Sequence, residues 1–353
     1  MEGAADPIDR STVPALYEAA PLGPYLIFLG DTVEPGYAKT AFGLRDWARN
    51  QCIGEVALRG ATVTADLPQL DPREAVAKGA KSLLIGVATP GGSIPEAWIP
   101  LLLDALCAGL DIVSGMHAKL NDIPELEAAA KTLGRRLVDV RVPPAHIPVG
   151  NGRKRPGKRL LTVGTDCALG KKYTALAVAR ALEARGVDTT FRATGQTGIM
   201  IAGSGIPLDA VVSDFIAGAA EMLTPTAADD HIDVIEGQGS LFHPAYAAVS
   251  LGLLHGSQPD MFIVCHQPGR TQVLGYPGFL LPSIEEVISQ TIALGRLTNP
   301  AIRCVGVSLN TASLTSDEAA RLIEGESDRL GLPVADPIRG GASFERLLDS
   351  CLA

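Results

Sequence analysis

The stretch from Leu160 to Thr174, LLTVGTDCALGKKYT, constrains the fold of this chain more than any other. An apolar run leads into a loop bounded by Gly164 and Gly170, which accept backbone angles that residues with a Cβ resist. The loop ends in Lys171 and Lys172, and the segment that follows has apolar residues at helical spacing. Loop amides and the positive end of a helix dipole together attract an anion. The stretch therefore predicts a strand, a phosphate-binding loop and a helix.

The loop departs from the common phosphate-binding motif in two ways. Five residues rather than four separate its glycines, and Lys172 stands where Ser or Thr usually holds Mg²⁺. The longer loop, with Thr165 and Asp166, looks like the GTD-type loop of dethiobiotin synthetase, an ATP-dependent ligase. The second lysine favours instead a phosphate without a metal, such as the pyrophosphate of coenzyme A. Thr174 can still reach a metal if the helix begins late.

Cys167 lies inside this loop, where the helix dipole and Lys171 favour a thiolate. The thiol can take an acyl group, or it can pack or make a weak hydrogen bond. Asn310, after a later strand, can read a purine edge or cap the next turn. The predicted coenzyme-binding residues are Gly164, Thr165, Asp166, Cys167, Ala168, Gly170, Lys171, Lys172 and Asn310.

The composition narrows the class of protein. With 353 residues the chain is long enough for two domains, and its low aromatic content of 5% with abundant Gly is typical of helices packed on parallel sheets. A net charge of −9 disfavours binding to nucleic acid or to an anionic membrane. Six cysteines without a CxxC pair indicate a reduced, cytoplasmic compartment. The acidic N-terminus shows no signal-peptide pattern, and no apolar run reaches about 18 residues.

Apolar runs and helical segments alternate along both halves of the chain, as they do in parallel sheets covered by helices. Residues 1–150 predict a small Rossmann-like domain without a GxGxxG motif, and we expect this domain to mediate homo-oligomerisation. Four prolines and a basic run between Pro143 and Lys158 mark the boundary. That basic run is typical of a solvated linker, although contact with nucleic acid or with a phosphate near the loop stays open. Residues 151–353 predict a doubly wound P-loop domain of five or six parallel strands.

Ligands of such domains bind beyond the carboxyl ends of the strands. After the second strand of this half, Arg192, Thr194 and Gln196 are predicted substrate ligands in a glycine-rich loop, unless that loop is only flexible surface. Arg270, on a Pro-Gly turn after the fourth strand, is a further predicted ligand of an acidic substrate.

The third strand of this half ends in Glu236, followed within a few residues by His243. Glu236 can hold a metal, accept a proton or bind an amine. His243 titrates near neutral pH and is a candidate general base, although many histidines are structural. Glu236 and His243 are therefore the predicted catalytic pair.

Four motifs in order, GTDCALGKK, RATGQTGIMIAGSGIPLDAVVSDFIAGAAE, EGQGSLFHP and CHQPGR, resemble domain-of-unknown-function family 1611. The characterised type of this family is the DgcN-type D-glutamate N-acetyltransferase. The resemblance implies acetyl-CoA as donor, an acidic D-amino acid as acceptor and a P-loop, Gly164 to Lys172, that binds the pyrophosphate of the coenzyme instead of a nucleoside triphosphate. The second lysine of the loop agrees with this, and we expect no metal. We expect direct attack of the substrate amine on the thioester. A Mg-ATP-dependent ligase or kinase is the alternative, and a non-enzymatic nucleotide-binding regulator is a third reading.

Overall fold

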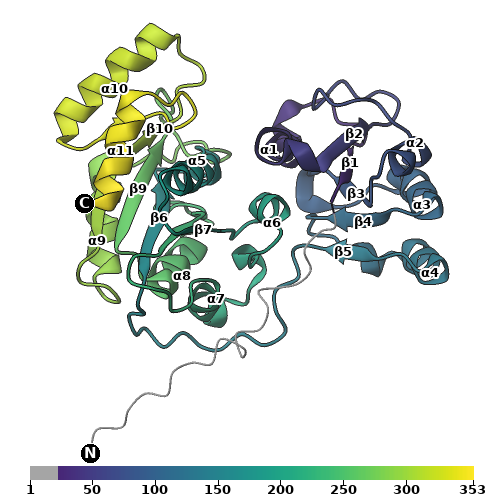
Figure 1. Cartoon of the computed structure of the whole chain (residues 1–353), viewed down its shortest axis with the longest axis horizontal. Coiled ribbons are helices and arrows are strands. Elements are labelled where there is room, and N and C mark those ends of the chain that lie inside the picture. The colour runs from purple at the N-terminus through teal and green to yellow at the C-terminus, as the bar shows by residue number, and fades with distance from the viewer. Residues whose placement is uncertain (1–22) are drawn as a thin grey trace, which may run out of the picture. The chain divides into compact units, whose positions relative to one another are not determined.

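The structure of this chain is a computed structural model that describes residues 23–353 (Figure 1). The acidic N-terminus, for which the sequence predicts no signal peptide, lies outside the described residues. The chain divides into two compact units. One contains the residues up to Pro144 together with Ile199–Gly205, and the other contains Ala145–Gly198 together with Ile206–Ala353. Among the described residues, no helix combines the length and the apolar character that crossing a membrane requires.

The first unit is a parallel five-stranded sheet with helices, which confirms the predicted Rossmann-like layer. Its strand order is β2-β1-β3-β4-β5, and every residue of β1, β3 and β4 is buried, as expected for a parallel sheet covered on both faces. The strands are β1 (Tyr25–Phe28), β2 (Cys52–Val56), β3 (Ser82–Ile85), β4 (Asp111–Ser114) and β5 (Leu137–Asp139). The helices are α1 (Lys39–Trp47), α2 (Pro72–Ala77), α3 (Ile99–Ala108) and α4 (Pro124–Leu133).

The second unit is a parallel six-stranded sheet of order β11-β10-β9-β6-β8-β7, flanked by helices (Figure 1). Its strands are β6 (Lys158–Gly164), β7 (Thr189–Arg192), β8 (Ile232–Ile235), β9 (Met261–His266), β10 (Arg303–Leu309) and β11 (Val334–Ala335). Its helices are α5 (Lys171–Ala184), α7 (Ile216–Leu223), α8 (Ala247–Ser257), α9 (Ile284–Gly295), α10 (Ser316–Leu330) and α11 (Ala342–Leu352). Helix α6 (Gln196–Ala202) begins in this unit and continues into the segment Ile199–Gly205 of the first unit. The doubly wound fold is confirmed, and β6 lies between β8 and β9 where the strand order reverses.

Helix ends in this unit follow the predicted signals. The side chain of Thr315 accepts a hydrogen bond from the backbone of Glu318, whose carboxylate accepts one from the Thr315 backbone, so the predicted capping box opens α10. Helix α5 ends at Ala184, and Gly186 follows with a φ of 78°, a left-handed conformation that suits glycine.

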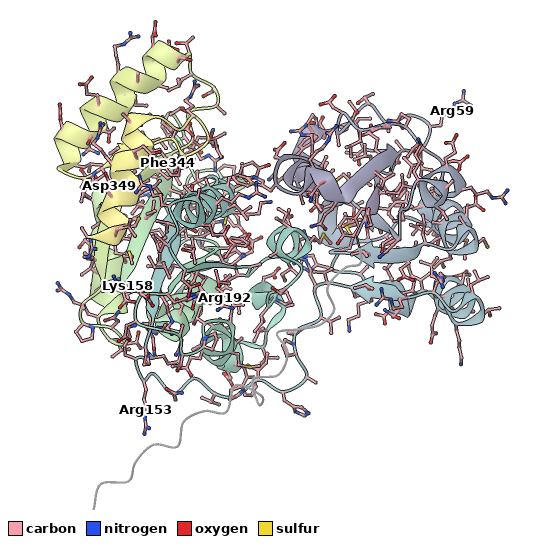
Figure 2. All side chains as sticks on the ribbon, in the orientation of Figure 1. Arg59, Arg153, Lys158, Arg192, Phe344 and Asp349 are labelled. Atoms are coloured by element: carbon pink, nitrogen blue, oxygen red, sulfur yellow. The ribbon has the colours of Figure 1, made fainter. Side chains whose placement is uncertain are left out.

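The basic run that leads into the first residues of β6 is structural. The buried Arg159 donates to the carbonyls of Pro156 and Pro225, and Arg155 donates to the carbonyl of Thr224, while Arg153 points outward (Figure 2). These residues lie at the amino end of β6, whereas the glycine loop follows its carboxyl end. Seven strand residues separate the two ends by about 20 Å. Contact between this run and a phosphate in the loop is therefore ruled out.

Candidate active site

The glycine loop after β6 is built as an anion cradle. Gly170 has a φ of 110°, and α5 begins at the next residue without a side-chain cap. A left-handed residue followed by a right-handed helix turns successive amides toward one side, and the first helical amides have no intrahelical acceptor. Within the described part of the chain, the amides of Ala168 and Leu169 also have no hydrogen-bond partner. The loop therefore presents several amide donors and the positive end of a helix 14 residues long.

The two lysines after the loop have different surroundings. Lys171 is buried, and its Nζ donates to the backbone carbonyl of Asp166 at 2.7 Å. Burial lowers the pKa of Lys171, and the nearby Cys167 and Cys265 oppose that shift. Lys172 is half-buried, and its charge acts on Glu236. Lys171 thus bridges the loop, whereas the charge of Lys172 acts on Glu236 at the end of β8.

Thr174 is not available for a metal. Helix α5 begins at Lys171, so Thr174 lies in its first turn with its hydroxyl turned into the sheet. That hydroxyl lies 2.8 Å from the hydroxyl of Ser308 and accepts a contact from Cys265. The helix does not begin late, so the condition under which Thr174 could reach a metal is not met.

The conformation of the loop is braced by a buried ion pair. The Asp166 carboxylate is fully buried and accepts from the Cys167 amide at 2.6 Å and the Leu274 amide at 2.8 Å. A guanidinium NH of Arg270 donates to the same carboxylate at 3.1 Å and to the Cys167 carbonyl at 2.9 Å. Arg270 therefore positions the loop, and its predicted contact with a substrate carboxylate stays a prediction. Thr165 adds a second brace, with its hydroxyl 3.0 Å from Nδ1 of His266.

Glu236 lies just beyond the end of β8 and is 5% exposed. Its Oε2 accepts the amides of Thr194 at 3.0 Å and Gly195 at 3.1 Å. Burial raises the pKa of Glu236, while the charge of Lys172 and the two amides oppose that shift. Its Oε1 accepts no hydrogen bond from the described residues. A buried carboxylate with one oxygen anchored and the other open suits proton transfer.

The buried His243 is oriented by its hydrogen bonds. Its Nδ1 accepts the backbone amides of Ala245 at 3.1 Å and Tyr246 at 3.2 Å. The ring stacks on Tyr246 with centroids 4.4 Å apart and meets the edge of Tyr276 at 5.0 Å. Burial lowers the pKa of His243, so the neutral imidazole is favoured. With Nδ1 accepting two amides, the proton resides on Nε2, which can donate a hydrogen bond, and the role of His243 as a base stays a prediction.

Asp166, Cys167 and His243 form a compact cluster at the loop. A carboxylate oxygen, the thiol sulfur and a ring nitrogen all lie within 4.8 Å of one another. The Asp166 carboxylate is already held by two amides and a guanidinium, whereas the half-buried Cys167 borders the exposed Ala168 at the loop tip. The sequence placed Cys167 in the loop, but only the fold brings His243 to it.

The predicted substrate ligands after β7 are dispersed. The Nε of Arg192 donates to the fully buried Asp233 at 2.6 Å, so this guanidinium is held by the neighbouring strand. The hydroxyl of Thr194 donates to the carbonyl of Glu236 and thereby positions the strand end. Gln196 begins helix α6, so the segment after β7 is partly helical rather than only the flexible surface loop that was the alternative. Roles of these residues in substrate binding stay predictions.

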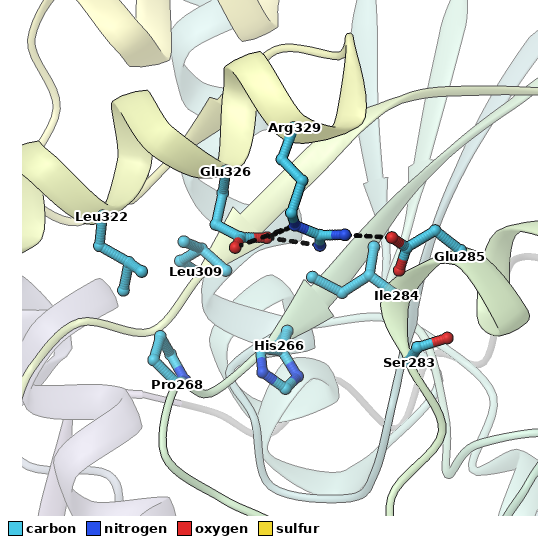
Figure 3. Close-up of a pocket in the computed structure, with 9 residues that line it drawn as sticks. All are labelled: His266, Pro268, Ser283, Ile284, Glu285, Leu309, Leu322, Glu326 and Arg329. Carbon is cyan, nitrogen blue, oxygen red and sulfur yellow. Dashed lines mark hydrogen bonds and ion pairs between the residues drawn. The ribbon is translucent and has the colours of Figure 1, made fainter.

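A pocket of about 480 Å³ lies beside the loop, beyond the ends of β9 and β10 (Figure 3). Its lining includes the apolar side chains of Ile284, Leu309 and Leu322, which come from three separate segments. At its rim Arg329 is paired with Glu285 and Glu326, as the dashed lines in Figure 3 show. His266 and Pro268 in its lining belong to the CHQPGR motif, but no local motif marks the other lining residues, so sequence reasoning missed this pocket. His266 connects it to the loop through Thr165.

Asn310 follows β10 directly and is half-buried. Its Oδ1 accepts the amide of Ala312 at 3.2 Å, which is the turn-capping arrangement expected as one of two possibilities. Its Nδ2 makes no hydrogen bond within the described residues, and the predicted contact with a purine stays a prediction.

Comparison with known families agrees with this architecture. Residues 148–348 match the domain of unknown function DUF1611_C, described as a P-loop domain, and residues 53–143 match DUF1611_N, described as a Rossmann-like domain. The chain belongs to the DUF1611 family. A crystal structure of a DUF1611 family protein from Anabaena variabilis superposes with a TM-score of 0.82 at 34% identity, covering 93% of this chain and 99% of that one.

Two curated relatives of this DUF1611 protein carry the same name. A D-glutamate N-acetyltransferase of Tritonibacter scottomollicae is 48% identical over 94% of this chain and 98% of its own length. A D-glutamate N-acetyltransferase of Pseudoalteromonas sp. is 46% identical over 90% of this chain and 96% of its own length. The similarity thus spans both domains in each case.

Proposed function

We propose that this protein transfers an acetyl group from acetyl-CoA to the amine of D-glutamate. The observation that carries the proposal is the near full-length similarity to two D-glutamate N-acetyltransferases. The site supports it with a cationic amide cradle for an acidic substrate and a buried carboxylate with a raised pKa. The six cysteines, all within the described residues, form no disulfide, which supports a cytoplasmic location. Homo-oligomerisation stays a prediction.

Glu236 is the proposed base. As the amine of D-glutamate attacks the acetyl carbonyl, the open Oε1 takes the proton that the amine loses. The Nε2–H of His243 is the donor for the negative charge that develops on the carbonyl oxygen. The charge of Lys172 opposes the rise that burial causes in the pKa of Glu236 and so favours its ionised form. This division of roles uses His243 in the protonation state that its hydrogen bonds favour.

The proposal is tested by mixing purified protein with acetyl-CoA and either D- or L-glutamate. Release of coenzyme A is followed with a thiol reagent, and the product is identified by mass spectrometry. We expect N-acetyl-D-glutamate without added metal. Formation of ADP from Mg-ATP, with no coenzyme A release, would contradict the transferase and favour the ligase reading.

We further propose that the pocket beside the loop receives the adenine ring of the coenzyme. Its floor is apolar and suits a flat heterocycle, whereas Glu285 and Glu326 at the rim disfavour phosphates. A Leu322→Trp variant fills the pocket and is expected to raise the KM for acetyl-CoA about tenfold, a loss of about 1.4 kcal/mol. The KM for D-glutamate should not change. Leu297→Trp, at an exposed position outside the pocket, is the matched control, and equal effects of the two variants would refute the assignment.

A further inference from the structure

We propose that Cys167 carries the acetyl group between the two substrates, as a covalent thioester on the enzyme. This inference rests on the proposed function and replaces direct transfer with two steps. It starts from the cluster in which the thiol sulfur, a carboxylate oxygen of Asp166 and a ring nitrogen of His243 all lie within 4.8 Å. The donors and charges around the thiol favour its reactive form.

The surroundings of Cys167 stabilise a thiolate. The residue lies in the loop that leads into the amino end of α5, where the helix dipole favours negative charge. Burial lowers the pKa of Lys171, and Cys167 is close enough to oppose that lowering, so the two groups interact electrostatically. The imidazole of His243, 2% exposed, places a ring nitrogen within 4.8 Å of the sulfur. Its Nε2 makes no hydrogen bond among the described residues and carries the ring proton, because Nδ1 accepts two amides. The helix dipole, Lys171 and His243 therefore favour negative charge on the sulfur. The opposing charge nearby is that of Asp166, and Arg270 compensates it.

The chemistry balances without any further reactant. In the first step the Cys167 thiolate attacks the acetyl carbonyl, a new S–C bond forms, and the S–C bond to coenzyme A breaks, releasing that thiolate. In the second step the amine of D-glutamate attacks the acetyl-cysteine, an N–C bond forms, and the cysteine thiolate leaves. The amine proton passes to Glu236, and nothing is oxidised or reduced. The first step exchanges one thioester for another, so the intermediate is close in free energy to acetyl-CoA.

The position of Cys167 also decides which anion the loop holds. The long pantetheine arm separates the thioester of acetyl-CoA from its pyrophosphate, so a thioester at Cys167 leaves the pyrophosphate outside the loop. The amides and Lys171 then hold a carboxylate of D-glutamate, next to the acetyl group that its amine must reach. The adenine ring lies in the neighbouring pocket, on the far side of Thr165 and His266. This arrangement replaces the expectation that the loop binds the coenzyme pyrophosphate.

Trapping the intermediate tests the proposal directly. Wild-type protein is mixed with acetyl-CoA without acceptor, quenched in acid and digested with trypsin, which isolates Cys167 as the only cysteine between Arg159 and Lys171. We expect one acetyl group on this peptide, removed by D-glutamate added before the quench. We also expect exchange of labelled coenzyme A into acetyl-CoA without acceptor, and parallel lines in double-reciprocal kinetics. Trapping and exchange need no acceptor, so they report on Cys167 even if D-glutamate is not the substrate.

Cys167→Ala should lose turnover by roughly 10³-fold and all exchange, whereas Cys107→Ala, at an exposed cysteine, should match wild type. Cys167→Ser should accumulate acetyl-enzyme, because an oxygen ester is discharged more slowly by an amine. Intersecting kinetic lines, an unmodified peptide and near-normal turnover of Cys167→Ala would together overturn the proposal. So would a stoichiometric zinc ion lost on the Cys167→Ala change, since the cluster would then be a metal site. Absence of N-acetyl-D-glutamate despite coenzyme exchange would count against the acceptor alone.

Discussion

Replacing Glu236 with glutamine is expected to lower kcat by about 10² to 10⁴-fold, the usual contribution of a general base. Glutamine keeps the shape of the side chain, and its carbonyl oxygen can still accept the amides of Thr194 and Gly195. The variant therefore loses the proton acceptor with little loss of packing. Steady-state kinetics with D-glutamate give the effect, and circular dichroism shows whether the fold is retained. Turnover within a few-fold of wild type would remove Glu236 from the mechanism.

The pH dependence of wild-type kcat gives a second readout of the same residue. Burial raises the pKa of Glu236, and only its ionised form accepts a proton. Activity should therefore rise with pH through this raised pKa and level off above it, and Glu236→Gln should lose that limb. The nearby Asp209 also raises the pKa of Glu236, so Asp209→Asn should move the limb to lower pH. A shift in the opposite direction would contradict the assignment.

Replacing Arg270 with methionine is expected to destabilise the P-loop domain by about 3–5 kcal/mol, since it leaves the buried Asp166 carboxylate without its cation. Both tryptophans, Trp47 and Trp98, lie in the first unit. Far-UV circular dichroism in urea should show the loss, while tryptophan fluorescence reports on the first unit. Activity should fall as well, because the loop that Arg270 braces carries the site.

A double-mutant cycle separates the ion pair from the loss of packing. Asp166→Asn combined with Arg270→Met removes both charges and should recover much of the stability, because no unpaired charge remains buried. Arg329→Met is the matched control. It breaks ion pairs at 46% side-chain exposure, where solvent screening limits the effect to within about 1 kcal/mol. Equal losses in Arg270→Met and Arg329→Met would show that burial of Asp166 does not matter.

Short-range patterns predicted most of the fold. The strand, glycine loop and helix around Gly164 and Lys171 lie where the sequence indicated, because glycine angles and apolar periodicity act within a few residues. Strand β11 is only two residues long and α2 only six, too short for periodicity to mark them. Arg192 was expected to bind substrate, but its partner Asp233 lies on the adjacent strand, and one sequence does not reveal such pairing.

The sequence alone was therefore enough to establish the class of fold, the anion cradle and the family, since each depends on residues close together in the chain. It also marked Glu236, His243, Cys167 and Arg270 as chemically relevant. The protonation state of His243, the bracing role of Arg270 and the meeting of His243 with Cys167 required the folded sheet. Those properties arise from contacts between the ends of β6, β8 and β9. Such contacts set burial, hydrogen-bond partners and local charge, and these quantities decide what an ionisable side chain can do.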